Sequence, residues 1–432
     1  MTSTPVETSR PLASSHTAGP AAPAAVAAVA PASPNAILAI ALVSYFMIVL
    51  DASIVITGLP HIRAALGFSE TGLSWVQNAY LLAFGGLLLL GARAGDLFGR
   101  RRMFLVGLAV STLASGAIGA ALSPAWMVVA RAVQGAGAAV LAPATLALLT
   151  STFAEGPART RALGLYGATA GISASLGLVV GGLVADLLSW RAGFFINLPV
   201  GLALMLAAWR HVRGMPPERA AGGAPTAPLL PPYLFADRGR AGAYAARFFF
   251  LGGMMGFWFF MTQYLQDERG MSAIQAGAAY LPATLTNFAA AMAVPRLSTR
   301  FGLRAVLTTG LVLSVAGVAA LGHLGAESGY WSAVALPMLL IGVGQGFALS
   351  PLTVAGVAGV AARDAGAASG VVNVAHQLGG SIGLAALVAV SSTAGTHDPG
   401  VHRFAIAFTA AAAMLAVALV TVLATQRRAG EG

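Results

Sequence analysis

The sequence predicts an all-α membrane protein in which twelve transmembrane helices form two six-helix halves. Hydrophobic residues make up 57% of the 432 residues and charged residues only 9%, a balance that soluble domains of this size do not show. The apolar residues gather in runs of roughly 20, the length that crosses about 30 Å of hydrocarbon. One long polar stretch, residues 212–241, divides these runs into six and six.

Each predicted span is an apolar run bounded by polar, glycine-containing or proline-containing segments. In chain order the twelve spans are 37–59, 74–92, 104–122, 126–149, 163–184, 194–211, 242–264, 275–294, 304–322, 330–353, 367–391 and 402–425. Because these helices are apolar all round, their periodicity does not tell which face is buried.

The segments outside the spans define the remaining organisation. Residues 1–35 are rich in Ala, Pro, Ser and Thr and have no apolar core, which indicates a disordered tail and not a signal peptide. Residues 212–241 are expected to be a linker. The two six-helix bundles are therefore predicted over 36–211 and 242–426.

A short motif occurs once in each half. Residues 93–101 follow the second span of the first half, and residues 296–304 follow the second span of the second half; both begin with Arg, contain Phe-Gly at the same two positions and end with Arg. The second copy has Thr299 where the first has Asp96. The repeat suggests two parallel halves related by an axis normal to the membrane.

The charge of the chain indicates its topology. The net charge is +10, and all 24 basic residues are arginines, most of which gather in alternate loops. By the positive-inside rule both termini are expected in the cytoplasm, and nucleic acid is not an expected partner. The expected location is the inner (plasma) membrane. The chain has no cysteine, so disulfides and thiolate metal sites are excluded, and no metal or cofactor is expected.

Asp51 is the only carboxylate inside the predicted spans. A charge at that depth costs at least about 2.5–3.5 kcal/mol, so it must be protonated, paired or next to water. At 1.5 Å per residue, Asp51 lies roughly 12 Å and Arg131 about 8 Å below the outer ends of their spans. We therefore expect an ion pair, which is either static or a proton-coupled switch.

Several polar and aromatic side chains in the spans are candidates for a substrate cavity. His376 lies near mid-membrane and could titrate, although a neutral ring that donates to Asn373 or to a helix backbone is the favoured interpretation. Aromatic residues could line an apolar cavity, or they could face lipid. The cavity candidates are Tyr45, Trp75, Tyr80, Gln134, Phe257, Gln263, Tyr264, Asn373 and His376.

The segment after the second span resembles a motif of major facilitator superfamily transporters, G-x-x-x-D-R-x-G-R-R/K. It matches Gly91, Asp96 and Gly99 and the cluster that includes Arg100 and Arg101, but has Leu97 where the family usually has Arg. The segment is expected to be a short charged hairpin. The resemblance implies the major facilitator fold, and it implies that these five residues form a conformational latch rather than only fixing topology.

Two further motifs resemble proton-driven members of that superfamily. Residues 131–139 match R-x-x-Q-G-x-G-A-A, in which the arginine, here Arg131, is implicated in proton transfer. Gly177, Gly181 and Gly182 resemble the antiporter motif G-P-x-x-G-G, with Leu178 in place of its proline. Small residues at this spacing also allow ordinary close helix packing, and the loss of proline predicts a less kinked helix.

The most specific resemblance is to the fourteen-helix drug:proton antiporter branch. Residues 189–201 are similar to its S-W-R-W-x-F-x-x-N-x-P-x-G segment, and residues 50–60 are similar to its L-D-x-S/T-x-V-N-x-x-L-P segment, with Ile56 in place of Asn. Residues 262–266, 277–282 and 370–380 extend the resemblance through the second half. The linker is too short to supply the two additional helices of that branch.

The resemblance implies a proton-coupled efflux transporter for lipophilic small molecules, powered by the proton gradient and not by a bound cofactor. Its expected partners are the substrate, protons and membrane lipid, and the protein is expected to be a monomer and not an enzyme. Two alternatives remain. One is an exporter of a single endogenous metabolite or self-made antibiotic, and the other is a non-transporting membrane receptor.

Overall fold

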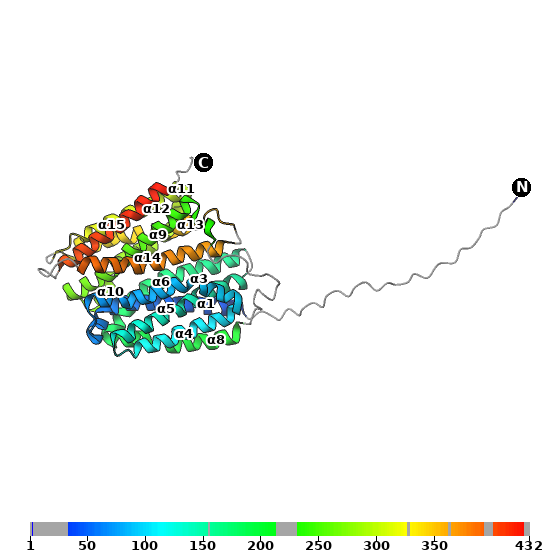
Figure 1. Ribbon diagram of the computed structural model, residues 1–432, viewed down its shortest axis with the longest axis horizontal. Helices are drawn as coiled ribbons and strands as arrows, with labels where there is room; N and C mark the ends of the chain where they lie inside the picture. The colour runs from blue at the N-terminus through cyan, green and yellow to red at the C-terminus, as the bar shows by residue number, and fades with distance from the viewer. Residues whose placement is uncertain are drawn as a thin grey trace.

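The computed structural model describes Thr2 and residues 33–153, 156–212, 231–325, 329–361, 364–392 and 401–426. The regular elements in these ranges are all helices (Figure 1). Most of the predicted tail and residues 213–230 of the predicted linker lie outside the described residues.

In the first half, six helical rods cover the six predicted spans, so the prediction for this half is confirmed. The sixth rod is broken in two, and one short helix lies between the first and second rods. The helices are α1 (Pro34–Leu66), α2 (Glu70–Leu73), α3 (Trp75–Phe98), α4 (Arg100–Gly119), α5 (Pro124–Thr152), α6 (Pro157–Leu187), α7 (Trp190–Phe195) and α8 (Asn197–His211).

The second half repeats this arrangement, with short 3-10 or π-helical turns joined to some rods. Its elements are η2 (Pro232–Phe235), α9 (Arg238–Gln263), η3 (Tyr264–Glu268), α10 (Ala273–Ala279), α11 (Leu281–Phe301), α12 (Leu303–Leu321), η4 (Trp331–Ala335), α13 (Leu336–Val357), α14 (Ala365–Ser392) and α15 (Val401–Thr425). In the described part of the chain, ten helices are long and apolar enough to cross a membrane; α6 and α11 complete the twelve rods.

The charged segment after the second span is not a hairpin loop, so this prediction was wrong. Helix α3 continues through Asp96 to Phe98, and α4 begins at Arg100. Gly99, with φ 91°, makes the whole connection. Gly302, with φ 84°, joins α11 to α12 in the same way. Glycine adopts this left-handed conformation without steric cost, which allows a single residue to reverse the chain in each half.

The two halves pack through two helix pairs. Helix α14 runs along the boundary in Figure 1 and packs on α3 of the first half, where Gly85 faces the side chain of Gln377 and Gly370 faces Leu89. Helix α10 packs on α6. Within the second half, α9 packs against α14 and α15 around a buried core that includes Phe257.

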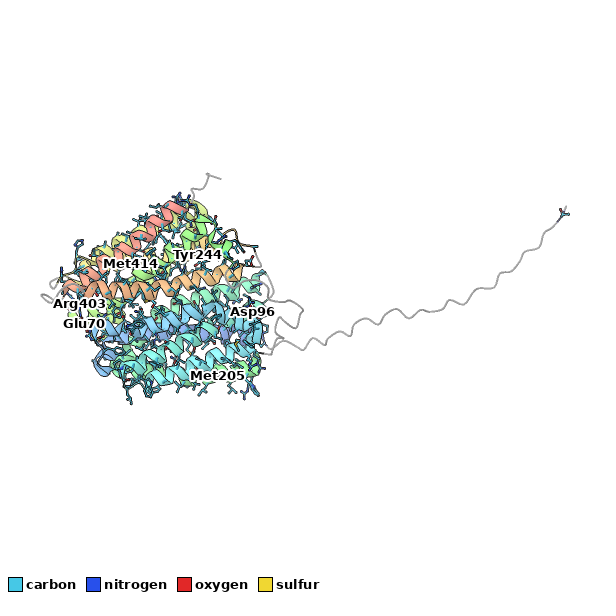
Figure 2. The ribbon with its side chains drawn as sticks, viewed as in Figure 1. Glu70, Asp96, Met205, Tyr244, Arg403 and Met414 are labelled. Atoms are coloured by element: carbon cyan, nitrogen blue, oxygen red, sulfur yellow. The ribbon has the colours of Figure 1, made fainter. Side chains whose placement is uncertain are left out.

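One end of the molecule carries polar contacts between the halves. We call the end at which α1 begins and α15 ends the terminal end, and the opposite one the distal end. At the distal end Arg63 donates to Asp267 at 2.9 Å, and Arg403 pairs with Glu70 (Figure 2). Asp186 of α6 accepts hydrogen bonds from the backbone at the start of α10, at 2.8 and 3.1 Å. These contacts close the distal end in this conformation.

The glycines of α6 allow this closure. A Cβ atom on Gly182 would lie 2.3 Å from the carbonyl oxygen of Ala273, and one on Gly277 would lie 2.5 Å from that of Leu178. Gly177 and Gly181 face Ser53 and residues one turn further along α1 in the same manner. Helix α6 continues without interruption through Leu178, as the loss of proline predicts.

We expect Gly182→Leu to weaken closure of the distal end, because the new side chain would collide with backbone atoms of α10. The chain is free of cysteine, so Arg63→Cys and Asp267→Cys can be introduced together and joined by a bis-maleimide whose spacer replaces the length of the arginine side chain. The crosslinking yield should fall severalfold in Gly182→Leu. Gly164→Leu is the matched control on the same helix, because a Cβ atom there meets nothing within 4 Å. Equal yields in the two variants would contradict this packing.

Candidate functional site: a buried carboxylate–arginine network

Asp51 and Arg131 form an ion pair inside the first half. Nη1 of Arg131 donates to Oδ2 of Asp51 at 2.9 Å. Asp51 is 5% exposed and Arg131 is fully buried. The structure therefore confirms the contact that the depths of the two residues predicted, although α1 extends to Leu66 and places Asp51 deeper than the sequence suggested.

The second oxygen of the carboxylate is held by two amides. Oδ1 of Asp51 accepts from Nε2 of Gln134 and from Nδ2 of Asn197, each at 3.0 Å. Both amides also donate to Oγ of Ser115, at 2.8 and 3.3 Å. Four helices, α1, α4, α5 and α8, thus meet at a single carboxylate.

Arg131 keeps contacts that do not involve the carboxylate. Its Nε donates to the carbonyl oxygen of Val76 at 2.9 Å, its Nη1 also donates to Oε1 of Gln134, and its guanidinium carbon lies 4.4 Å from the ring centre of Tyr80. Its Nη2 is buried without a partner in the described part of the chain. The arginine is therefore anchored to α3 even when Asp51 is neutral.

The geometry matches the acceptors that a carboxylate offers. Three donors are directed at the two oxygens of Asp51, and one of them, Arg131, also supplies the opposite charge.

The predicted cavity residues of the first half occupy different environments. Tyr80 and Gln134 belong to the network around Arg131. Tyr45 is half-buried and stacks on Tyr166 of α6, with ring centres 4.0 Å apart. Trp75 is 48% exposed at the distal end of α3. Contact of these residues with a substrate stays a prediction.

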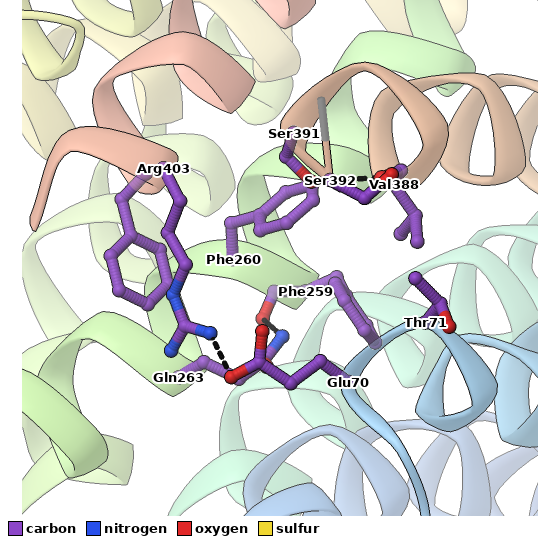
Figure 3. A pocket seen from close by; sticks show the side chains of 10 residues that line it. Glu70, Thr71, Phe259, Phe260, Gln263, Val388, Ser391, Ser392 and Arg403 are labelled. Carbon is purple, nitrogen blue, oxygen red and sulfur yellow. Dashed lines mark hydrogen bonds and ion pairs between the residues drawn. The ribbon is translucent and has the colours of Figure 1, made fainter. Parts of the chain in front are cut away.

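The predicted cavity residues of the second half also occupy different environments. Phe257 is buried against Tyr280, and Tyr264 is buried against Phe404. Asn373 is exposed and donates to a backbone carbonyl of its own helix. Gln263 lines a pocket at the distal end (Figure 3). The side chains around that pocket are Glu70, Thr71, Phe259, Phe260, Gln263, Val388, Ser391, Ser392, Arg403 and Phe404.

Among the described residues the partner of His376 is Arg247 and not Asn373 or a helix backbone, so the predicted partner of this residue was wrong. Its Nδ1 lies 2.9 Å from Nη2 of Arg247 in α9. Sequence reasoning missed Arg247, although a basic residue inside the predicted span 242–264 was a signal available for it. It missed Asn197 and Ser115 as partners of Asp51 as well; Asn197 stands in one of the motifs, whereas a serine in an apolar span gives no such signal.

The residues of the predicted latch lie at the terminal end, where Asp96 is labelled in Figure 2. Arg101 donates to the carbonyl oxygen of Trp209 at 2.8 Å, which ties the start of α4 to the end of α8. Gly91 lies against the backbone of α5: a Cβ atom on Gly91 would lie 2.2 Å from the carbonyl oxygen of Ala139. Gly99 forms the turn, and Arg100 begins α4. Their role as a latch stays a prediction.

Comparison with known proteins identifies the family. Residues 41–384 match the family model of the Major Facilitator Superfamily. The chain belongs to this superfamily. It is 35% identical to the cephamycin export protein CmcT of Amycolatopsis lactamdurans, over 89% of this chain and 91% of the relative. It is 34% identical to the puromycin resistance protein pur8 of Streptomyces alboniger, over 90% of this chain and 91% of the relative.

Solved structures of superfamily transporters share the fold. The nucleoside transporter NupG has a TM-score of 0.70 at 13% identity, and the match covers 91% of this chain and all of NupG. A bacterial homologue of the human lysosomal transporter Spinster has a TM-score of 0.72 at 15% identity, over 90% of this chain and 96% of that one. The chain is thus a multi-pass membrane transporter of the twelve-helix major facilitator fold.

We expect Asn197→Leu to destabilise the first half, because it removes a buried donor from both Asp51 and Ser115. Loss of such hydrogen bonds typically costs about 1–3 kcal/mol. The measurement is the free energy of unfolding in detergent micelles. Asn373→Leu is the control, because that amide is exposed and bonds only within its own helix. A loss as large in Asn373→Leu would show that the network does not stabilise the fold.

Proposed function

We propose that this protein exports lipophilic small molecules in exchange for protons by alternating access. The observation that carries the proposal is the buried network of Asp51, Arg131, Gln134, Asn197 and Ser115. It holds the carboxylate deep inside a transporter. An unpaired charge is costly there, and an ionisable residue at such a position usually has a function. The names of the relatives, which include export and resistance proteins, support export as the direction of transport.

The chemistry of the coupling follows from the contacts of the network. When Asp51 is ionised, the pair with Arg131 and the two amide bonds hold α1, α4, α5 and α8 together. When Asp51 takes up a proton, Arg131 keeps Val76 and Tyr80 but loses its counter-charge. The two protonation states therefore favour different packing of the first half, and this difference can be coupled to the rocking of the halves.

The two ends of the molecule supply the gates in this proposal. The arginine distribution suggests that the terminal end faces the cytoplasm, so a closed distal end gives a substrate access from the cytoplasm or the inner leaflet. In the opposite conformation, the distal contacts at Arg63, Asp186 and Arg403 would separate. Asp96 and Arg100 would then hold the cytoplasmic ends of the halves together.

A second candidate is a transporter for one endogenous metabolite or self-made antibiotic. This candidate is favoured by the names of two relatives, the cephamycin export protein and the tetracenomycin C resistance and export protein of Streptomyces glaucescens. The second of these is 32% identical over 84% of this chain. Both candidates use the same proton-coupled cycle, and they differ only in the range of substrates.

We expect Asp51→Asn to abolish proton-coupled export, because an amide cannot exchange the proton. In inverted vesicles with an inside-acid gradient, lipophilic cations and neutral antibiotics are added and a pH-sensitive dye is followed. Substrate-dependent alkalinisation should be present in the wild type and absent from Asp51→Asn.

The control for this experiment is Asp237→Asn, which removes a carboxylate that only caps the start of α9. This variant should alkalinise like the wild type. Full alkalinisation in a folded Asp51→Asn would contradict the assignment of the proton carrier.

The range of substrates is measured by resistance. A hypersensitive host that expresses the protein is tested against unrelated toxic compounds, and Asp51→Asn provides the inactive reference. Broad efflux predicts raised minimum inhibitory concentrations for several chemical classes. Protection against one class alone would favour the exporter of a single compound.

A further inference from the structure

The second half contains a buried cation that the proton-coupled cycle does not use. Arg247 lies in α9 and is 7% exposed. Its Nη1 donates to the carbonyl oxygen of Leu349 at 2.8 Å and to Oγ1 of Thr353 at 2.9 Å, and its Nη2 donates to Nδ1 of His376 at 2.9 Å. All three partners are able to accept a hydrogen bond without carrying a negative charge.

The tautomer of His376 follows from this contact. A guanidinium can only donate hydrogen bonds, so Nδ1 of His376 must accept and cannot carry a proton. The ring is therefore neutral, with its hydrogen on Nε2. The buried Nε–H of Arg247 has no partner in the described part of the chain. One buried donor of this arginine therefore lacks an acceptor.

The position of Arg247 places it at the boundary between the halves. Its partners come from α13 and α14, and its own helix α9 packs against α1, the helix of the first half that carries Tyr45. Tyr45 stacks on Tyr166 of α6, so the first half places an aromatic pair on the helix that packs against α9. An aromatic surface beside a buried cation fits a ligand with an apolar body and a negative group.

Another buried arginine of the same helix shows what a purely structural role looks like. Arg240 is 6% exposed and donates to the carbonyl oxygens of Tyr233, Leu234 and Ala358, close to the start of α9 at the terminal end. All three of its guanidinium nitrogens are used. Arg247 differs because its Nε is buried without a partner and because it lies at the boundary between the halves.

We propose that Arg247 binds the carboxylate of a lipophilic anionic substrate whose apolar part lies against Tyr45 and Tyr166. This inference rests on the proposed export function and names its substrate class. A carboxylate would supply the missing counter-charge and accept from the unpaired Nε–H of Arg247. Anionic lipid headgroups share this chemistry, and the experiment with defined lipids distinguishes a substrate carboxylate from a lipid headgroup.

The test is direct binding by calorimetry to purified protein in nanodiscs of zwitterionic phosphatidylcholine. The probes are 2-naphthoate, methyl 2-naphthoate and 2-naphthylmethylammonium, which share one apolar ring system and differ in charge. The wild type should bind 2-naphthoate about tenfold or more tightly than the ester or the cation, the difference expected for a charge-assisted pair. Arg247→Gln should lose that preference and keep the affinity for the ester.

Two further variants keep the test decisive if Arg247→Gln fails to fold. Arg247→Lys retains the charge and should retain a preference for 2-naphthoate, whereas Arg240→Gln, the matched control, should bind like the wild type. Equal binding of acid and ester by the wild type, or retention of the preference in Arg247→Gln, would overturn the proposal. Loss of 2-naphthoate binding in nanodiscs that contain phosphatidylglycerol would overturn it too, in favour of a lipid site.

Failure of this inference can be distinguished from failure of the proposed export function. The binding assay requires no proton gradient, and the vesicle assay is run with 2-naphthoate as well as with cations and neutral compounds, with Asp51→Asn as the reference. If the wild type alkalinises vesicles with any of these compounds while naphthoate shows no binding preference, export stands and the anion site falls. If alkalinisation is absent with every compound, 2-naphthoate included, but naphthoate binding depends on Arg247, the site stands without the transport cycle.

Discussion

The structure of the first half depends on the need to pair a charge that is buried in an apolar environment. Asp51 cannot remain ionised inside the bundle unless Arg131 and the amides of Gln134 and Asn197 satisfy both of its oxygens. Meeting this requirement brings four helices to one point.

The two halves share a fold but distribute charge differently. The first half pairs its buried arginine with an acid, whereas the buried Arg247 of the second half has only neutral acceptors in the described residues. In the functions proposed above, one half handles the proton and the other handles the substrate. The close contacts of α3 with α14 and of α6 with α10 join the two halves.

Much of the fold could be predicted from the sequence because the length of an apolar run is dictated by the thickness of a bilayer, and each of the twelve runs forms a helical rod. The Asp51–Arg131 contact could be predicted because an unpaired acid is so costly there. The one-residue turn at Gly99 could not, since helices that extend beyond the hydrocarbon leave no hydropathy signal. The pairing of His376 with Arg247 depends on how α9 and α14 are rotated, which an all-round apolar pattern does not encode.

The most direct test of the proton-carrier role is the infrared signal of the carboxyl group of Asp51. Spectra of the protein in nanodiscs would be recorded as the pH is lowered, for the wild type and for Asp51→Asn, with and without a transported compound. We expect a protonated-carboxyl band that is present only in the wild type and whose midpoint pH changes when the compound binds. A spectrum identical in the two proteins, or a midpoint indifferent to the compound, would contradict the coupling of protons to transport through Asp51.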